Sequence, residues 1–167
     1  MTAVNLDISL NLIGTYAGVN DLASVQASVN IRNNMAFRPG GDANQANKMF
    51  SDTRTVAASA NDDLDLAGSL VDPVGATLTF ASVKAIYIKA GAANANDLVF
   101  GPAPSNGFLG PWADASDRVS LKAGEVFLIT NRAATGWGVT AGTGDLLRVT
   151  NGGSGAAVTY DIVLIGD

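Results

Sequence analysis

Residues 138–167 read GVTAGTGDLLRVTNGGSGAAVTYDIVLIGD, and this closing stretch decides the fold class. Its three apolar runs are separated by the glycine-rich segments AGTGD (141–145) and NGGSG (151–155). Glycine adopts the positive φ angles of tight turns without steric cost, so the pattern predicts two hairpin loops between three consecutive strands. Neither segment carries the lysine or the following helix that a phosphate-binding loop needs.

Short strands of the same kind precede this stretch from residue 76 onward. Each is bounded by Gly, Asn, Asp or Pro, and they are TLTF (77–80), AIYIK (85–89), DLVFG (97–101), RVSLK (118–122), EVFLITN (125–131) and GWGVT (136–140). No helix of about ten residues with an apolar stripe interrupts them, which argues against βαβ units. We therefore predict an all-β fold, a jelly-roll-like antiparallel β-sandwich.

One break in the alternation indicates an irregular point in the sheet. Ile86 and Ile88 share one face of AIYIK, and the polar residues Ser82 and Lys84 have the same parity. Because side chains alternate between the two faces of a strand, an unbroken strand would place both polar residues beside the isoleucines. We predict a β-bulge or a corner between sheets at this point.

The N-terminal stretch has the most regular pattern in the chain. In VNLDISLNL (4–12) apolar and polar residues alternate without a fault, and VQASVNIR (25–32) repeats this alternation. The segment GTYAGVND (14–21) supplies turn residues between them, so residues 4–32 are predicted to form an amphipathic β-hairpin. A lone hairpin is only marginally stable in water. Its apolar stripe must therefore lie on the body of the protein or on a neighbouring subunit.

The segment after the hairpin is the least patterned. We expect a loop with a short helical turn over residues 43–48, a strand in TRTVAAS (53–59) and a second loop in NDDLDLAGSLVDPVG (61–75). This divides the chain into an N-terminal hairpin and loop (1–50) and a β-sandwich body (51–167).

The composition excludes several classes of function. The chain has no histidine and no cysteine, which excludes Ser-His-Asp and Cys-His catalysis and thiolate metal sites. Its net charge is −5, and that charge lies wholly beyond residue 54, which argues against nucleic acid as a partner. No apolar run reaches the roughly 20 residues that span a bilayer, and the start lacks the pattern of a cleavable export signal. We expect a soluble protein with no membrane partner.

Two groups of residues could carry chemistry or binding, and each has a plainer interpretation. The acidic clusters Asp62, Asp63 and Asp65, and Asp114 and Asp117, could hold a structural cation, but aspartate also recurs in turns because it bonds its own backbone. Trp112 and Trp137 could stack on sugars, or pack in the core or at a subunit interface. We expect no enzyme activity and no cofactor.

Residues from about 60 to 167 combine TFASVKAIYIK, DLVFGPAPSNGF, DRVSLKAGEVFLI, GWGVTAGTGDLLRVTN and VTYDIVLIG in this order. This series resembles small structural proteins of tailed bacteriophages. The resemblance implies a jelly-roll-like fold and a role as a capsid decoration (cement) protein on the outer surface of the virion, made in the host cytoplasm. It also implies a homotrimer that binds the major capsid protein or other virion proteins, and it brings no catalytic residues.

We therefore expect a capsid decoration protein whose first 40 residues supply much of the contact with the shell or a neighbour. The alternatives are a tail, neck, baseplate or fibre component, and a carbohydrate-binding module for a receptor. The candidate contact residues are Val4, Leu6, Ile8, Leu10, Val25, Val29, Ile31, Arg32, Phe37, Arg38, Trp112 and Trp137.

Overall fold

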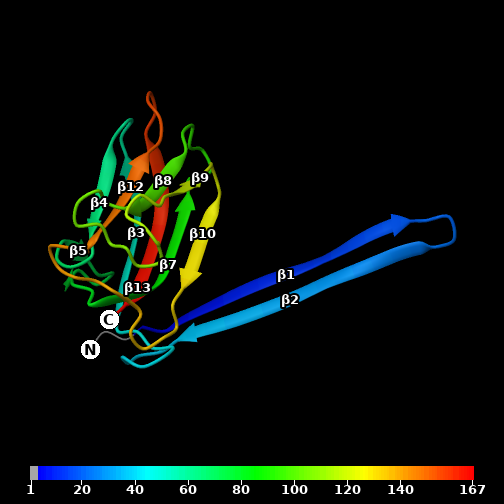
Figure 1. The fold of residues 1–167 in the computed structure, drawn as a ribbon, viewed down its shortest axis with the longest axis horizontal. Coiled ribbons are helices and arrows are strands. Elements are labelled where there is room, and N and C mark those ends of the chain that lie inside the picture. The colour runs from blue at the N-terminus through cyan, green and yellow to red at the C-terminus, as the bar shows by residue number, and fades with distance from the viewer. Residues whose placement is uncertain (1–3) are drawn as a thin grey trace.

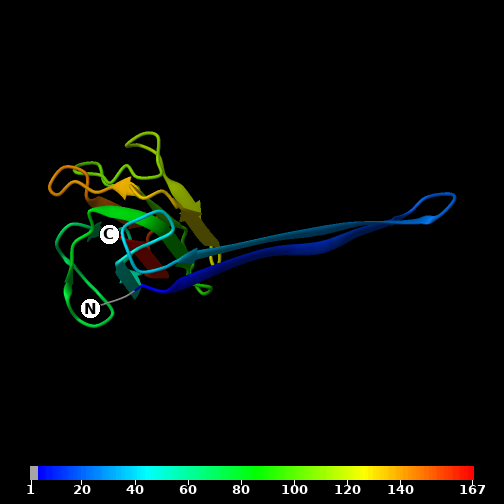
Figure 2. The ribbon, with the colours of Figure 1, turned by 90° about the horizontal axis from the view of Figure 1, so that it is seen from below.

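The alternating patterns pair into antiparallel sheets throughout the computed structural model, which describes residues 4–167. Within this range the protein is all-β and contains no helix. A long ribbon of two strands, which we call the arm, projects from a body of stacked sheets (Figures 1 and 2). The arm consists of β1 (Leu6–Val19) and β2 (Ser24–Phe37).

The body contains two main sheets. Sheet I has the order β10 (Val126–Thr130), β7 (Ser82–Ala90), β13 (Val158–Gly166) and β3 (Lys48–Val56), and β11 (Trp137–Gly138) pairs with the start of β7. Sheet II has the order β4 (Asn61–Asp65), β12 (Leu146–Asn151), β8 (Leu98–Pro102) and β9 (Val119–Leu121). A small ribbon of β5 (Leu70–Val71) and β6 (Thr77–Leu78) lies beside them.

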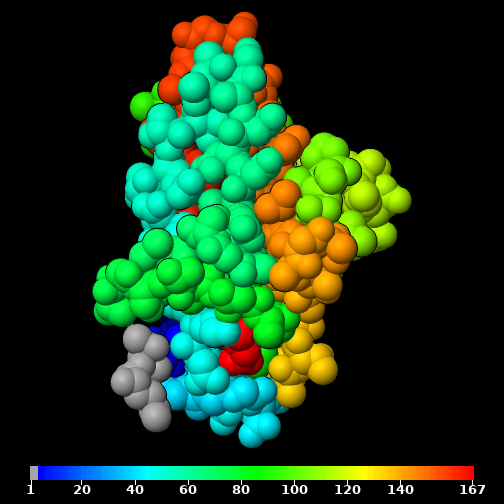
Figure 3. Space-filling model, turned by 90° about the vertical axis from the view of Figure 1, so that its left-hand side faces the viewer, coloured from blue at the N-terminus to red at the C-terminus, as the bar shows by residue number. Residues whose placement is uncertain are grey.

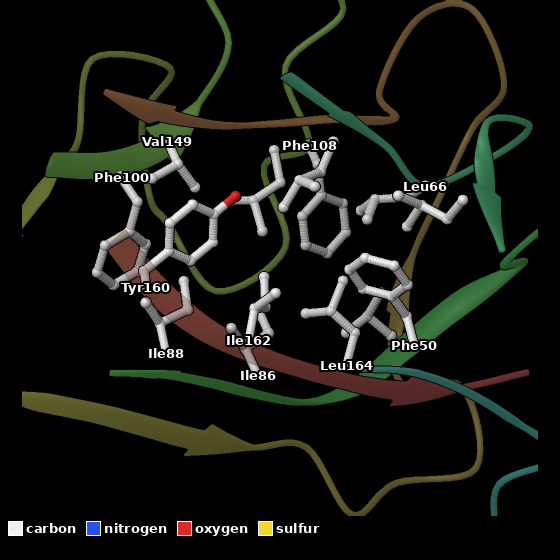
Figure 4. Close-up of a cluster of buried hydrophobic side chains, with 14 of the residues drawn as sticks. Phe50, Leu66, Ile86, Ile88, Phe100, Phe108, Val149, Tyr160, Ile162 and Leu164 are labelled. Atoms are coloured by element: carbon white, nitrogen blue, oxygen red, sulfur yellow. The ribbon is translucent and has the colours of Figure 1, made fainter. Parts of the chain in front are cut away.

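The core fills the space between the two sheets, as expected for a β-sandwich. Ile86, Ile88, Ile162 and Leu164 of sheet I are fully or almost fully buried. Side chains of sheet II and its loops lie opposite them in Figure 4, among them Phe100, Val149 and Phe108. Period-two alternation therefore produces this core directly, because it gives each sheet one apolar face.

The predicted strands from residue 85 to the C-terminus are confirmed, but the predicted hairpin loops are wrong. Segment 141–145 leads from β11 in sheet I to β12 in sheet II, and segment 151–155 leads from β12 to β13 in sheet I. The glycines still form turns, with positive φ at Gly142 and Gly155. Consecutive strands do not pair here, because the two sheets bury their apolar faces against each other.

Three other expectations need correction. The segment 61–75 is not simply a loop, because β4 and β5 lie within it. Residues 43–48 form turns and the start of β3 rather than a helical turn. The boundary between arm and body falls before Lys48 rather than after residue 50, because β3 pairs with β13 over its whole length and buries Phe50 in the core.

The predicted bulge is confirmed, and it involves Lys84. Ile165 pairs with Ala85 and Gly166 pairs with Val83, so Lys84 is an extra residue of β7 without a counterpart on β13. The extra residue reverses the parity of the strand. As a result Val83 joins the main core although its number is odd, while Ile86 and Ile88 are even.

The Lys84 side chain is fully buried and its ammonium is surrounded by oxygen atoms. It donates hydrogen bonds to the carbonyl oxygens of Gln45 (2.8 Å), Asp42 (3.3 Å) and Gly41 (3.5 Å), and to the Asp167 carboxylate (2.5 Å). Figure 3 shows the segment 38–47 in cyan beside the red C-terminus. One buried charge therefore joins the segment that follows the arm, sheet I and the end of the chain.

Removing this charge should destabilise the protein strongly. Lys84→Met removes the ammonium that donates to three carbonyls and to one oxygen of the Asp167 carboxylate, and we expect a loss of about 3–5 kcal/mol in the free energy of unfolding. Denaturant unfolding measures the loss. Lys122→Met is the control: its ammonium lies 3.5 Å from Asp97 with 74% of the side chain exposed, so it should change stability by less than about 0.5 kcal/mol. Equal effects of the two substitutions would contradict the role of Lys84.

A second polar cluster connects the two sheets. Asp62 of β4 accepts hydrogen bonds from Arg54 of β3 (2.6 and 2.9 Å) and from the buried Tyr160 of β13 (2.7 Å). Burial of Asp62 opposes its charge, but the hydrogen bonds from Arg54 and Tyr160 outweigh burial and lower the pKa of Asp62 from its ordinary value of 3.8. Burial and the bond to Asp62 raise the pKa of the Tyr160 phenol. The cluster thus requires an ionised Asp62.

The lowered pKa of Asp62 predicts how stability changes with pH. A depressed carboxyl pKa contributes stability above the unfolded pKa of about 4 and loses it as the pH falls through the folded pKa. Asp62→Asn should therefore be less stable than the wild type by about 1–2 kcal/mol near neutral pH. The difference should shrink below about pH 4. Denaturant unfolding across this pH range tests the prediction, with Asp21→Asn at the exposed arm tip as the control. A difference that stays constant down to about pH 2 would refute it.

Candidate interaction surface

The arm is a regular antiparallel ribbon that extends well beyond its predicted limits. Its register runs without interruption from Leu6↔Phe37 at the root to Val19↔Ser24 at the tip. At the usual rise of about 3.4 Å per residue, fourteen residues extend for about 45 Å. Segment 14–19, predicted as a turn, is strand, and the loop contains only residues 20–23.

The tip closes through a side-chain turn rather than through glycine. The Asn20 carboxamide oxygen accepts hydrogen bonds from the backbone N–H groups of Leu22 (3.1 Å) and Ala23 (2.8 Å). Asparagine forms such turns because its short side chain reproduces a backbone carbonyl. Gly14 and Gly18 instead lie within the strand, opposite Val29 and Val25.

The register divides the arm into two faces. The apolar face carries the even-numbered residues of β1 and the odd-numbered residues of β2, because paired residues point to the same side. Beyond the root it contains Leu10, Leu12, Gly14, Tyr16, Gly18, Val25, Ala27, Val29, Ile31 and Asn33. The opposite face is mainly polar and carries Asn11, Thr15, Ser28, Asn30 and Arg32, together with the apolar residues Ile13, Ala17 and Val19.

Nothing in residues 4–167 covers the apolar face beyond the root. Every residue from Ser9 to Asn34 is exposed, with relative exposures of 50% at Leu12, 80% at Tyr16 and 96% at Leu22. Both edges of the ribbon also leave backbone groups unpaired, which is a template for pairing with another chain. Exposed apolar strips are common at sites of interaction between proteins.

The root of the arm is fixed to the body by a separate apolar cluster. Val4 and Phe37 are buried with Ala46, Ala85 and Ile165, and Leu6, Ile8, Met49 and Val163 pack around them. The apolar face of the arm therefore begins on the outer face of sheet I. Of the predicted contact residues, Val4 and Phe37 anchor the arm, and Leu6 and Ile8 lie at the transition.

Four of the predicted contact residues beyond the root lie on one exposed face. Leu10, Val25, Val29 and Ile31 share the apolar face and are about half exposed. Arg32 lies on the opposite face and donates to Asn30 (3.2 Å). Arg38 binds Asp7 (2.6 Å) and the carbonyl oxygen of Phe37 (3.2 Å), so its contacts within the chain hold the root together.

The two tryptophans pack on the core of the body. The ring of Trp112 packs edge to face with the rings of Phe100 and Phe108, at centroid distances of 6.4 Å and 6.2 Å. Trp137 lies in β11 opposite Val83 and is also partly buried against the core. The structure therefore does not bring Trp112 and Trp137 together with the exposed face of the arm.

The acidic residues are engaged in structural contacts. Asp62 and Asp63 bind Arg54 and Arg148, and Asp65 accepts the backbone N–H of Ala67. Asp117 accepts the N–H groups of Ala113 and Asp114. Hydrogen bonds from the hydroxyl and the backbone N–H of Ser116 lower the pKa of Asp114. Among the described residues no three carboxylates gather in an arrangement that could hold a metal ion.

The sequence interpretation missed Tyr16, Val19 and Leu22 as exposed apolar residues at the far end of the arm. A signal for Tyr16 existed, because it continues the even-numbered apolar series that begins at Val4. The two glycines obscured that series, since glycine in a strand pattern normally indicates a turn or a bulge. The far end of the arm thus carries more apolar surface than the hairpin prediction implied.

Comparisons with protein-family models, curated proteins and solved structures found no match. Within the described chain, no helix could cross a membrane. The arm is an amphipathic ribbon, anchored at one end, with an apolar face suited to burial against protein.

The free energy of unfolding tests whether the root alone fixes the arm to the body. Phe37→Ala should create a cavity in the root cluster and cost about 3–5 kcal/mol of unfolding free energy. Tyr16→Ala removes an aromatic ring that is 80% exposed and should change stability by less than about 0.5 kcal/mol. Denaturant unfolding of both variants measures the contrast. A comparable loss in Tyr16→Ala would mean that the far end of the arm contributes to folding of the single chain.

Proposed function

We propose that the protein is a structural component of a tailed-phage virion, a capsid decoration protein whose arm is its assembly element. The observation that carries this proposal is the uncovered apolar face from Leu10 to Ile31 on a ribbon fixed firmly at its root. A protein that works by packing needs broad complementary surface and no reactive centre. The chain has neither histidine nor cysteine.

We further propose that the body is a jelly roll. The support is the strand order: β10-β7-β13-β3 in sheet I and β4-β12-β8-β9 in sheet II. A jelly roll consists of eight strands in two stacked sheets that the chain builds by repeated crossing. Here β3, β7, β10 and β13 alternate along the chain with strands of sheet II, apart from the consecutive pair β8 and β9.

The distribution of charge supports attachment through the arm. Residues 1–54 hold four acidic and four basic residues, so the whole net charge of −5 belongs to the remainder of the chain. The apolar face of the arm holds no charged residue beyond the root, so burying this face desolvates no charge, and charged groups are the costly ones to desolvate. The acidic body then faces solvent.

The proposed partners are the major capsid protein or other virion proteins, and further copies of the chain in a homotrimer. Cyclic assemblies repeat a single interface around an axis. An assembly also contacts a shell at several points at once, and linked contacts raise avidity without strengthening each one. Weak individual contacts are then sufficient for stable attachment.

A tail, neck, baseplate or fibre position would use the same surface, and the experiment below separates it from the shell. Glycan binding has less support. Trp112 and Trp137 are partly buried against the core. For Trp112, stacking on a sugar ring would compete with packing on Phe100 and Phe108.

Shortening the arm should abolish attachment to the particle. Replacing residues 11–32 by Asn-Gly keeps the root and closes the ribbon with a two-residue turn. We expect the wild-type protein to co-sediment with empty heads of the phage that encodes it, at a ratio that saturates one class of symmetry site. The shortened protein should remain in the supernatant and keep the circular dichroism spectrum of a folded β-protein.

Ile13→Asp in the full-length arm is the control, because Ile13 lies on the polar face and its substitution leaves the apolar face intact. It should bind heads as the wild type does. Unchanged binding of the shortened protein would overturn the role of the arm. Binding to tails instead of heads in electron micrographs would mean that the protein is a tail component.

A further inference from the structure

A groove lies in the angle between the arm root and the outer face of sheet I. Leu6 and Ile8 form its arm wall, and Ala85, Tyr87, Leu128 and Val163 line its sheet wall. Leu128 and the neighbouring Val126 are exposed. An apolar surface on the body is thus continuous with the apolar face of the arm.

The root shows that these two surfaces fit each other. There, Leu6, Ile8 and Phe37 of the arm pack against Ala85, Val163 and Ile165 of sheet I. The uncovered part of the arm continues with the same kinds of side chain, at Leu10, Leu12 and Ile31. Beyond the root, however, the arm points away from its own body (Figures 1 and 2). The outer face of sheet I therefore cannot receive the far part of its own arm.

The area of the arm decides what kind of partner it needs. Strands rise about 3.4 Å per residue and lie about 4.8 Å apart, so the face from Leu10 to Gly18 and from Val25 to Asn33 measures about 300 Å². With the surface that it covers, one such contact buries about 600 Å², half of the roughly 1,200 Å² of a small stable interface. A single arm contact is therefore weak by itself, but copies that both give and receive an arm double the buried area of each copy.

We propose that the arm of each copy lies, apolar face inward, on the outer face of sheet I of another copy, and that every copy gives one arm and receives one. The charges favour this arrangement. The apolar face carries no charged residue beyond the root. The sheet side of the groove, formed by Ala85, Tyr87, Leu128 and Val163, carries none either, while Asp7 lines its arm side and the cross-strand pair of Asp161 and Lys89 lies further along the same face. The inference rests on the proposed function only in taking the arm as the assembly element.

Engineered cysteines test the contact directly, because the chain has none of its own. Leu128→Cys is combined, one at a time, with Leu12→Cys, Tyr16→Cys, Val25→Cys or Val29→Cys in the full-length protein. Tyr16 lies about 27 Å further along the strand than Ile8, which lines the groove. A disulfide needs Cα atoms within about 7 Å of each other. A bond between Tyr16→Cys and Leu128→Cys therefore joins two copies.

After mild oxidation, we expect covalent dimers or trimers on non-reducing gels for at least one of these pairs. Matched controls place the cysteine on the polar face at Thr15, Gln26 or Ser28, with the same Leu128→Cys. They should cross-link at least about tenfold less, since their side chains point away from the receiving sheet. Equal cross-linking from the two faces, or none from the apolar face, would overturn the proposal.

The mass in solution provides a second readout. The wild-type protein and Ile13→Asp should be dimers or trimers by light scattering, and Leu12→Asp should be a monomer that keeps the circular dichroism spectrum of the folded protein. A monomeric wild type, or an oligomer that Leu12→Asp leaves intact, would also overturn the proposal. Cross-linked copies that ignore phage heads would instead refute the proposed function alone, and head binding without cross-linking would refute only the exchange of arms.

Discussion

The buried ammonium of Lys84 is the constraint on which the position of the arm depends. A fully buried charge is tolerated only where hydrogen bonds replace its hydration, and Gln45, Asp42, Gly41 and Asp167 supply the oxygen atoms. These partners come from the segment after the arm and from the C-terminus, so the charge determines where both must lie. Such a contact contributes more to a unique arrangement than to net stability, because desolvation offsets much of the attraction.

Because its root is fixed to the body, the long projecting ribbon can be stable. An isolated two-stranded ribbon is marginal in water, yet this one begins from a register held by Phe37 in the root cluster and by the Arg38–Asp7 pair. The first pairs are thus formed by the body, and each further pair extends an existing ladder. The arm can therefore present a large apolar face at a defined angle without any contact of its own at the far end.

Local sequence patterns predicted the strands well and their partners poorly, for a physical reason. Alternation encodes which side of a strand is buried, so the strands from Ala85 to Gly166 and the bulge at Lys84 could be read from parity alone. It does not encode the sheet to which a strand belongs. Segments 141–145 and 151–155 resemble hairpin loops because glycine serves any tight turn. Their crossing between sheets is decided by core residues far apart in the chain, such as Leu147 and Ile162.

Apolar and polar residues alternate in the same way in the body and in the arm, but the apolar face is buried in the body and exposed in the arm. The reason is that the body has two layers of sheet and the arm has one. A sheet with one apolar face requires a second layer. In the body, sheet II covers Ile86 and Ile162 of sheet I. In the arm, Leu10, Leu12 and Ile31 follow an equally regular pattern, but no second layer exists within residues 4–167. A sequence that keeps this alternation over the free length of a ribbon, with no cover from its own chain, specifies half of an interface. We infer that the other half belongs to another molecule.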